Sequence, residues 1–135
     1  MRRATLLLAL GALVAAPSAA ARSSERIVKV GPKANGTTVL LHPADTLVVS
    51  LPGNATTGYS WRIRAVNRTV LQHTSTRYVP KTPIRVGSGG TYVLRFDAAM
   101  AGVSTLKLVY VRAGRNAKVA KKFTLDVNVK GFPTV

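Results

Sequence analysis

Cysteine is absent from this sequence, and acidic residues are almost absent. Without a thiol, the chain cannot carry out thiol catalysis, bind zinc through cysteine or stabilise its fold with disulfides. Its four carboxylates are outnumbered by 20 lysines and arginines, which gives a formal net charge of +16 at pH 7. Such a charge is compatible with a polyanion-binding protein, with a protein that acts on an acidic partner, or with a basic soluble surface.

Residues that could support catalysis or bind a metal are few and scattered. The carboxylates are Glu25, Asp45, Asp97 and Asp126. The two histidines, His42 and His73, lie in unrelated segments without the spacing of shared metal ligands. No serine has the sequence context of a nucleophile elbow. We therefore expect neither an enzyme nor a metal or cofactor site.

The N-terminus has the layout of a secretory signal peptide. Arg2 and Arg3 precede an apolar run over residues 4–16, and small residues follow at 18–21. A run of about 13 residues is shorter than the roughly 20 that a membrane span needs. We expect residues 1–21 to be cleaved and residues 22–135 to form one domain, secreted or, in a bacterium, periplasmic. Loss of Arg2 and Arg3 would lower the net charge from +16 to about +14.

Apolar and polar residues alternate through most of the remaining sequence. In TLDVNV, for example, Leu125, Val127 and Val129 point one way while Thr124 and Asp126 point the other. A period of two over short segments predicts half-buried β-strands, and their Val, Ile, Thr and Tyr residues favour strands. The other residues expected on apolar strand faces are Leu47, Val49, Leu51, Tyr59, Trp61, Ile63, Tyr92, Leu94, Phe96, Leu106, Leu108, Tyr110 and Phe123.

Glycine and proline separate the predicted strands and set their number. Turn signals occur at 31–32, 35–36, 42–43, 52–53, 80–83, 87–90, 102 and 114. No segment after the N-terminus shows a convincing helical period. We predict an all-β fold, an immunoglobulin-like β-sandwich of about 7–8 strands, with a small barrel as the alternative. The dense basic segment 112–122 is expected to be a loop between two strands.

The positions of the basic and aromatic residues argue against nucleic-acid binding. Several cations are expected on outward strand faces, where they favour solubility and discourage edge pairing: Arg62, Arg64, Arg95, Lys107 and Lys130. Binding of single strands would require exposed aromatic rings beside such cations. Only Tyr78 and Phe132 fall outside the apolar faces. We therefore consider nucleic acid an unlikely partner and expect a monomer.

Two short glycine-containing segments stand out between the strands. The segment GNATTGYSW, residues 53–61, contains no charged residue, although the chain is strongly basic. Such a small neutral tip between Gly53 and Gly58 could enter a narrow slot and offer hydroxyl and backbone groups, or it could be an ordinary hairpin turn. GSGG, residues 87–90, is too short for a dinucleotide fingerprint and leads into a strand, so spacing alone indicates a tight turn.

Three segments follow one another in the order LPGNATTGYSW at 51–61, GSGGTYVLRF at 87–96 and LVYVRAG at 108–114. Together they resemble the chagasin family of inhibitors of papain-like cysteine peptidases. The family pattern is Asn-Pro-Thr-Thr-Gly-aromatic-x-Trp, then Gly-x-Gly-Gly, then Arg-Pro-aromatic, and the resemblance covers residues 47–130. It implies an immunoglobulin-like fold with the three loops at one end. The first loop would enter the catalytic cleft and the other two would flank it.

The resemblance also implies which residues contact a peptidase. Carried over by position, they are Asn54, Ala55, Thr56, Thr57, Gly58, Gly87, Ser88, Gly89, Gly90 and Arg112. Ala55 replaces the family's proline, and Ala113-Gly114 replaces its Pro-aromatic pair. The implied inhibition is competitive, reversible and non-covalent. The rival interpretation is a basic, polyanion-binding or adhesion-type immunoglobulin-like module without inhibitory activity.

Overall fold

The computed structural model describes Gly11, residues 25–115 and residues 117–131. The proposed signal peptide lies outside these residues except for Gly11, and so does Phe132. Eight strands and two short 3-10 turns follow one another along the described chain. They are β1 (Ile27–Val30), η1 (Pro32–Ala34), β2 (Thr37–Leu41), β3 (Thr46–Gly53), η2 (Ala55–Thr57), β4 (Tyr59–Ala65), β5 (Leu71–Pro80), β6 (Gly90–Ala98), β7 (Gly102–Arg112) and β8 (Val119–Val129).

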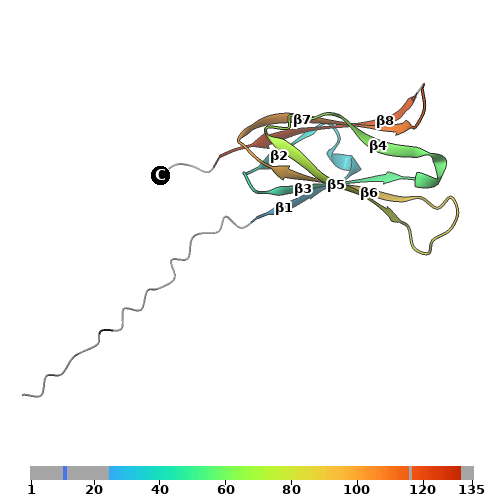
Figure 1. The fold of residues 1–135 in the computed structure, drawn as a ribbon, viewed down its shortest axis with the longest axis horizontal. Coiled ribbons are helices and arrows are strands. Elements are labelled where there is room, and N and C mark those ends of the chain that lie inside the picture. The colour runs from blue at the N-terminus through green and yellow to red at the C-terminus, as the bar shows by residue number, and fades with distance from the viewer. Residues whose placement is uncertain (1–10, 12–24, 116, 132–135) are drawn as a thin grey trace, which may run out of the picture.

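The strands form two four-stranded sheets that face each other (Figure 1). One sheet has the order β1-β3-β6-β5, and the other has the order β2-β8-β7-β4. β1 pairs parallel with β3 and β2 pairs parallel with β8, while the other neighbours are antiparallel. The prediction of an all-β immunoglobulin-like sandwich is therefore confirmed. Within the described residues, no helix is long and apolar enough to cross a membrane.

The inward faces of both sheets supply the core, as the alternation predicted. Leu47, Val49 and Leu51 of β3 are buried against the facing sheet. The other predicted members that are buried there are Trp61, Tyr92, Leu94, Phe96, Leu106, Leu108, Tyr110, Phe123, Leu125, Val127 and Val129. Tyr59 and Ile63 pack against this cluster from the edge strand β4. Burial of these side chains is the main favourable term in folding.

Three local expectations are wrong. Residues 119–122 of the basic segment belong to β8, so the connection after β7 is shorter than predicted. Pro52 and Gly53 continue β3 instead of forming a turn, because Gly53 is paired with Gly90 of β6. Tyr78 is half-buried, and its ring packs against that of Tyr92 at 4.9 Å. Because most residues of β5 are exposed, the strand has no apolar alternation that would predict an inward position for Tyr78.

A buried carboxylate fixes the end of the sandwich where β1 begins. Asp45, 5% exposed, accepts hydrogen bonds from the backbone N–H groups of His42 (2.9 Å) and Arg26 (3.3 Å). The Arg26 guanidinium also lies 3.3 Å from Asp45 Oδ2. Burying a carboxylate is unfavourable unless it is paired and hydrogen-bonded, and both conditions are met here. Asp45 thus joins the start of β1 to the β2–β3 turn.

Trp61 provides a test of the core. Its ring is 6% exposed, and its Nε1–H donates to the Pro52 carbonyl at 3.0 Å. Trp61→Ala should lower the free energy of unfolding by about 3–5 kcal/mol because it leaves a cavity. Trp61→Phe keeps most of the buried ring and should cost only about 1–2 kcal/mol. Urea denaturation measures both, and a loss below about 1 kcal/mol for Trp61→Ala would contradict this assignment to the core.

Candidate functional site

Three connections meet at the end of the sandwich opposite Asp45. They are the β3–β4 loop (54–58), the β5–β6 loop (81–89) and the β7–β8 loop between Arg112 and Val119, and all lie at the right in Figure 1. Strand pairing fixes their bases. Gly90 pairs with both Gly53 and Pro80, and Tyr59 pairs with Arg112. The structure therefore brings together the three segments that carry the family resemblance.

Hydrogen bonds within the β3–β4 loop hold it in one shape. Asn54 Oδ1 accepts from the Thr56 backbone N–H at 3.1 Å and from Thr56 Oγ1 at 2.6 Å. Thr57 Oγ1 donates to the Asn54 carbonyl at 2.7 Å. Gly58 then ends the turn with φ 80°, a left-handed conformation that favours glycine. The loop therefore has a defined shape without the family's proline at Ala55.

Four aromatic side chains anchor this loop to the core, and we call Tyr59, Trp61, Tyr92 and Tyr110 the aromatic platform. The Tyr110 ring lies 5.2 Å from that of Trp61 and 5.3 Å from that of Tyr59. The Tyr110 hydroxyl accepts the Asn54 backbone N–H at 2.8 Å, and the Tyr92 hydroxyl donates to the Tyr59 carbonyl at 3.0 Å. Burial, with the neighbouring Tyr110 and Tyr78 hydroxyls, raises the pKa of Tyr92, so it remains a donor.

Gly53 is required by this platform and not by a bend. A Cβ at this position would lie 2.6 Å from Cε2 of Tyr92 and 3.3 Å from Cε2 of Tyr110. Any side chain would therefore push the rings away from the backbone. The sequence predicted a turn at 52–53, but the role of Gly53 is to leave room for the two rings.

The β5–β6 loop lies against the β3–β4 loop. Asn54 Nδ2 donates to the Gly87 carbonyl at 3.3 Å, and Gly87 has φ 81°. Gly89, at φ 74°, comes so close that a Cβ there would lie 3.2 Å from the Gly53 carbonyl oxygen. Ser88 Oγ donates to the Arg85 carbonyl at 2.8 Å and closes the loop. The fourth motif residue, Gly90, is already the first residue of β6.

The β7–β8 loop contributes a cation and an unusual turn. Arg112 ends β7 beside the first loop, since a Cβ at Gly58 would lie 3.6 Å from Arg112 Nε. Gly114 has φ 147°, which L side chains rarely adopt, and a Cβ there would meet nothing within 4 Å. This turn therefore depends on glycine at the position where the family motif has an aromatic ring.

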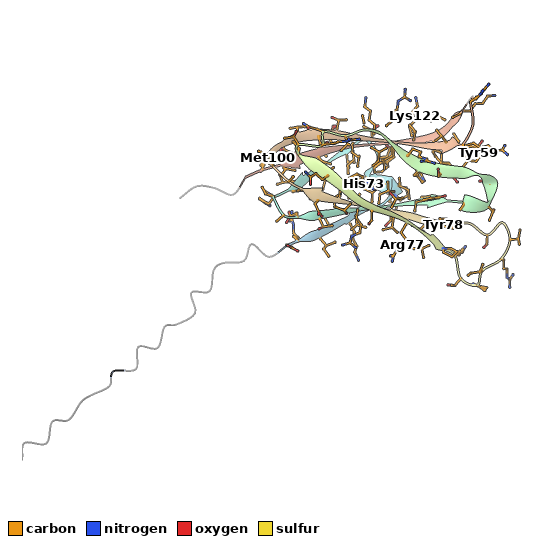
Figure 2. The ribbon with its side chains drawn as sticks, in the orientation of Figure 1. Tyr59, His73, Arg77, Tyr78, Met100 and Lys122 are labelled. Carbon is orange, nitrogen blue, oxygen red and sulfur yellow. The ribbon has the colours of Figure 1, made fainter. Side chains whose placement is uncertain are left out.

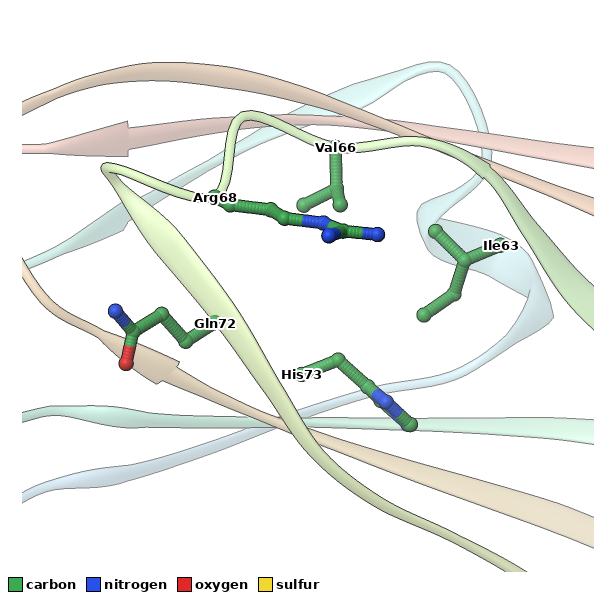
Figure 3. Close-up of a pocket in the computed structure, with 5 residues that line it drawn as sticks. All are labelled: Ile63, Val66, Arg68, Gln72 and His73. Carbon is green, nitrogen blue, oxygen red and sulfur yellow. The ribbon is translucent and has the colours of Figure 1, made fainter.

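The loop end offers hydrogen-bonding groups and a defined shape. Among the described residues, no three His, Cys, Asp or Glu side chains lie close enough together to hold a metal ion. A separate hollow lies at the open side of the sandwich, between β4 and β5, and is lined by Ile63, Val66, Arg68, Gln72 and His73 (Figure 3). It includes none of the loop residues that the sequence singled out.

Sequence reasoning missed the hydroxyl contacts of the platform. It placed Tyr92 and Tyr110 on apolar faces, which is correct for their rings. Their chemistry could have indicated these contacts, because a buried tyrosine hydroxyl needs a hydrogen-bond partner. The partners, the Tyr59 carbonyl and the Asn54 N–H, are assembled only when the sheets pack.

A β-sandwich that holds three adjacent loops at one end, two of them internally hydrogen-bonded, has the architecture of a loop-presenting binding protein. Residues 41–129 match the model of a family described as Chagasin family peptidase inhibitor I42. The chain belongs to the chagasin family of peptidase inhibitors, as its three motifs indicated.

A relative agrees with this membership, and two solved structures share the fold. Amoebiasin-1 of Entamoeba histolytica is 30% identical over 98 residues, which cover 71% of this chain and 93% of that protein. The crystal structure of EhICP2, a cysteine protease inhibitor of the same organism, superimposes with a TM-score of 0.69 at 18% identity, covering 79% of this chain and 98% of that one. PbICP-C, solved in complex with falcipain-2, gives a TM-score of 0.53 at 17% identity over 79% of this chain and 93% of that one.

Two substitutions of Asn54 test how the first loop is held. Asn54→Ala removes the acceptor for Thr56, so we expect the amide order parameters of residues 55–57 to fall from about 0.85 to below about 0.6. Asn54→Asp keeps that acceptor and loses only the donor to Gly87, so these order parameters should stay high. Relaxation of ¹⁵N nuclei measures both variants, and an equally rigid loop in Asn54→Ala would contradict the role given to this side chain.

Proposed function

We propose that this protein inhibits papain-like cysteine peptidases by placing the loop 54–58 in the catalytic cleft. The observation that carries the proposal is the neutral, hydrogen-bonded β3–β4 loop, held on the aromatic platform between the two other motif loops. Membership of a family of peptidase inhibitors supports the inhibition of a peptidase. The choice of cysteine peptidases is supported by EhICP2, described as a cysteine protease inhibitor, and by the complex of PbICP-C with falcipain-2.

The loop is suited to a narrow cleft because its own polar groups are already partnered. The hydroxyl protons of Thr56 and Thr57 are both donated within the loop. The backbone N–H groups of Thr57 and Gly58 are bonded to the Asn54 and Ala55 carbonyls. Little polar desolvation and little loss of conformational freedom would accompany insertion, which favours tight non-covalent binding.

The same geometry explains how the loop would block the cleft without acting as a substrate. Ala55–Thr57 is a 3-10 turn, whereas a peptide in a cleavage site lies extended. The loop would exclude substrate and offer no well-placed scissile bond, so inhibition would be competitive and reversible. Gly87, Ser88, Gly89 and Gly90 would flank it on one side and Arg112 on the other.

We also propose that the protein acts outside the cytoplasm, as a monomer, after removal of residues 1–21. The charged, apolar and small-residue regions of the N-terminal sequence support this proposal.

Intact mass of the exported protein measures this processing. We expect a chain that begins at residue 21 or 22, because both small-x-small sites at 18–21 precede these positions. An exported chain that retains residues 1–20 would contradict the proposed cleavage.

Changing both Thr56 and Thr57 to Glu should abolish inhibition, because two carboxylates would lose water in the cleft without a partner. Both side chains are exposed, so the melting temperature should stay within a few degrees of the parent's. The measurement is residual papain activity on a fluorogenic peptide at increasing inhibitor concentration. Full inhibition by the glutamate variant would show that this loop does not enter the cleft.

Two matched variants identify the cause. Thr56→Ser with Thr57→Ser keeps the hydroxyls and should inhibit within about tenfold of the parent. Thr56→Val with Thr57→Val keeps the size and neutrality but removes the two hydroxyl bonds that hold the loop in shape, at about 1 kcal/mol each. Because the loop must then be ordered on binding, affinity should fall by up to roughly 5-fold per bond. If the valine variant is as inactive as the glutamate variant, loop shape and not charge is responsible.

A further inference from the structure

All the carboxylates of the described chain lie in the half of the sandwich away from the three loops. Glu25 precedes β1, and Asp45 lies in the β2–β3 turn. Asp97 pairs with Thr46 at the start of β3, and Asp126 pairs with Thr38 of β2. The registers of β3 with β6 and of β7 with β8 thus place Asp97 and Asp126 in the half away from the loops. No described carboxylate therefore balances the cations at the loop end.

Exposed cations surround the loops, and we call this set the cationic collar. Its members are Arg62, Lys81, Arg85, Arg112, Arg115, Lys118, Lys121 and Lys122. Arg62 and Lys122 lie on either side of Val109 across three paired strands, and Figure 2 shows Lys122 on the side of the sandwich formed by β7 and β8. Most members belong to β7, β8 and their connection, so the collar is densest beside the β7–β8 loop.

The collar has no internal neutralisation. Among residues 25–115 and 117–131, the ion pair between a guanidinium and a carboxylate joins Arg26 to Asp45 at the other end. Within the collar, Lys121 Nζ lies 5.8 Å from the centre of the Tyr110 ring, a cation–π contact that keeps the charge. Gathered like charges without counter-charges produce a surface potential of several kT. The loop that the collar surrounds, 54–58, is itself neutral.

We infer that the collar selects papain-like peptidases whose cleft rim is acidic, with the acidic surface opposite the β7–β8 loop. This inference rests on the proposed function and adds the kind of partner. A neutral tip fits the cleft, while the surrounding cations attract the rim before contact is made. Such attraction raises association rates by roughly 10–10³-fold at low salt and fades as salt screens it.

Arg112 has a different role from the rest of the collar. It lies beside Gly58 at the base of the inserted loop, so it would touch the rim in the complex. Arg115 and Lys118 lie beyond the end of β7, in the β7–β8 loop, and act through the field. Their charge should therefore alter the association rate, whereas Arg112 should also alter dissociation.

The experiment pairs two inhibitor variants with two enzymes. Arg115→Glu with Lys118→Glu reverses two charges of the collar, and Lys33→Glu with Lys130→Glu makes the same change of net charge outside the collar, in η1 and directly after β8. All four side chains are exposed. The enzymes are papain and a papain variant with glutamates added around its cleft, itself checked for activity. Stopped-flow kinetics at low and at 0.5 M NaCl give association and dissociation rates for each pair.

The parent inhibitor should associate with the glutamate-rimmed papain at least about tenfold faster than with papain at low salt, with a smaller gain at 0.5 M NaCl. The Lys33/Lys130 variant should keep most of this gain, and the Arg115/Lys118 variant should lose it while its dissociation rate stays within about twofold. Equal gains for the two variants would overturn the inference.

Two further outcomes separate this inference from its alternatives. Inhibition of both enzymes with no dependence on the rim would overturn the role of the collar and leave the proposed function intact. Inhibition of neither would overturn both. Heparin chromatography is run in parallel. Retention that is lost only in the Arg115/Lys118 variant, with unchanged peptidase association, would assign the collar to polyanions and overturn the inference.

Discussion

The hydrogen bond between the Tyr110 hydroxyl and the Asn54 backbone N–H, 2.8 Å long, joins the core of this protein to its β3–β4 loop. Tyr110 is 7% exposed and belongs to β7, whereas Asn54 follows β3 in the other sheet. The bond therefore ties the two sheets together at the end where the loops emerge. Without it, a buried hydroxyl would lose its donor, which is unfavourable in a low-dielectric interior. The loop's position depends on packing between the sheets.

In the β3–β4 loop, side-chain hydrogen bonds restrict the backbone conformation at the place where the family motif has a proline. Proline would restrict φ in the unfolded chain as well as in the folded one. Alanine at position 55 gives no such restriction, so the loop relies on Asn54, whose amide bonds to Thr56 within the loop and to Gly87 in the next one. One side chain thus sets both the shape of the first loop and its distance from the second.

The charged residues lie around the β3–β4 loop, and the loop itself (54–58) is neutral. The buried carboxylate, Asp45, stabilises the far end by pairing with Arg26. At the loop end, cations are exposed and without carboxylates in the described chain, so they repel one another and favour an acidic partner. The neutral loop avoids the desolvation that a buried charge would bring. The buried ion pair therefore lies at one end of the sandwich, and the loops proposed to contact a peptidase lie at the other.

The sequence by itself determined the strands with clear alternation, the inward residues of β3, β4, β6, β7 and β8, and the three motifs that indicate the family. Those features are local, because a period of two and a short motif can both be recognised from residues that are neighbours in the sequence. It did not single out β5, most of whose residues are exposed at the sheet edge, so they carry no apolar pattern. The same held for the short strands β1 and β2.

Only the tertiary structure decided why Gly53 is glycine, what the hydroxyls of Tyr92 and Tyr110 bind, and that the described carboxylates lie in the half of the sandwich away from the loops. Each depends on pairs that lie far apart in the chain, such as Asn54 with Tyr110 or Asp97 with Thr46. Strand register and sheet packing bring these residues together. Strand register and sheet packing cannot be read from the sequence around any single residue, because these contacts exist only once distant strands have paired.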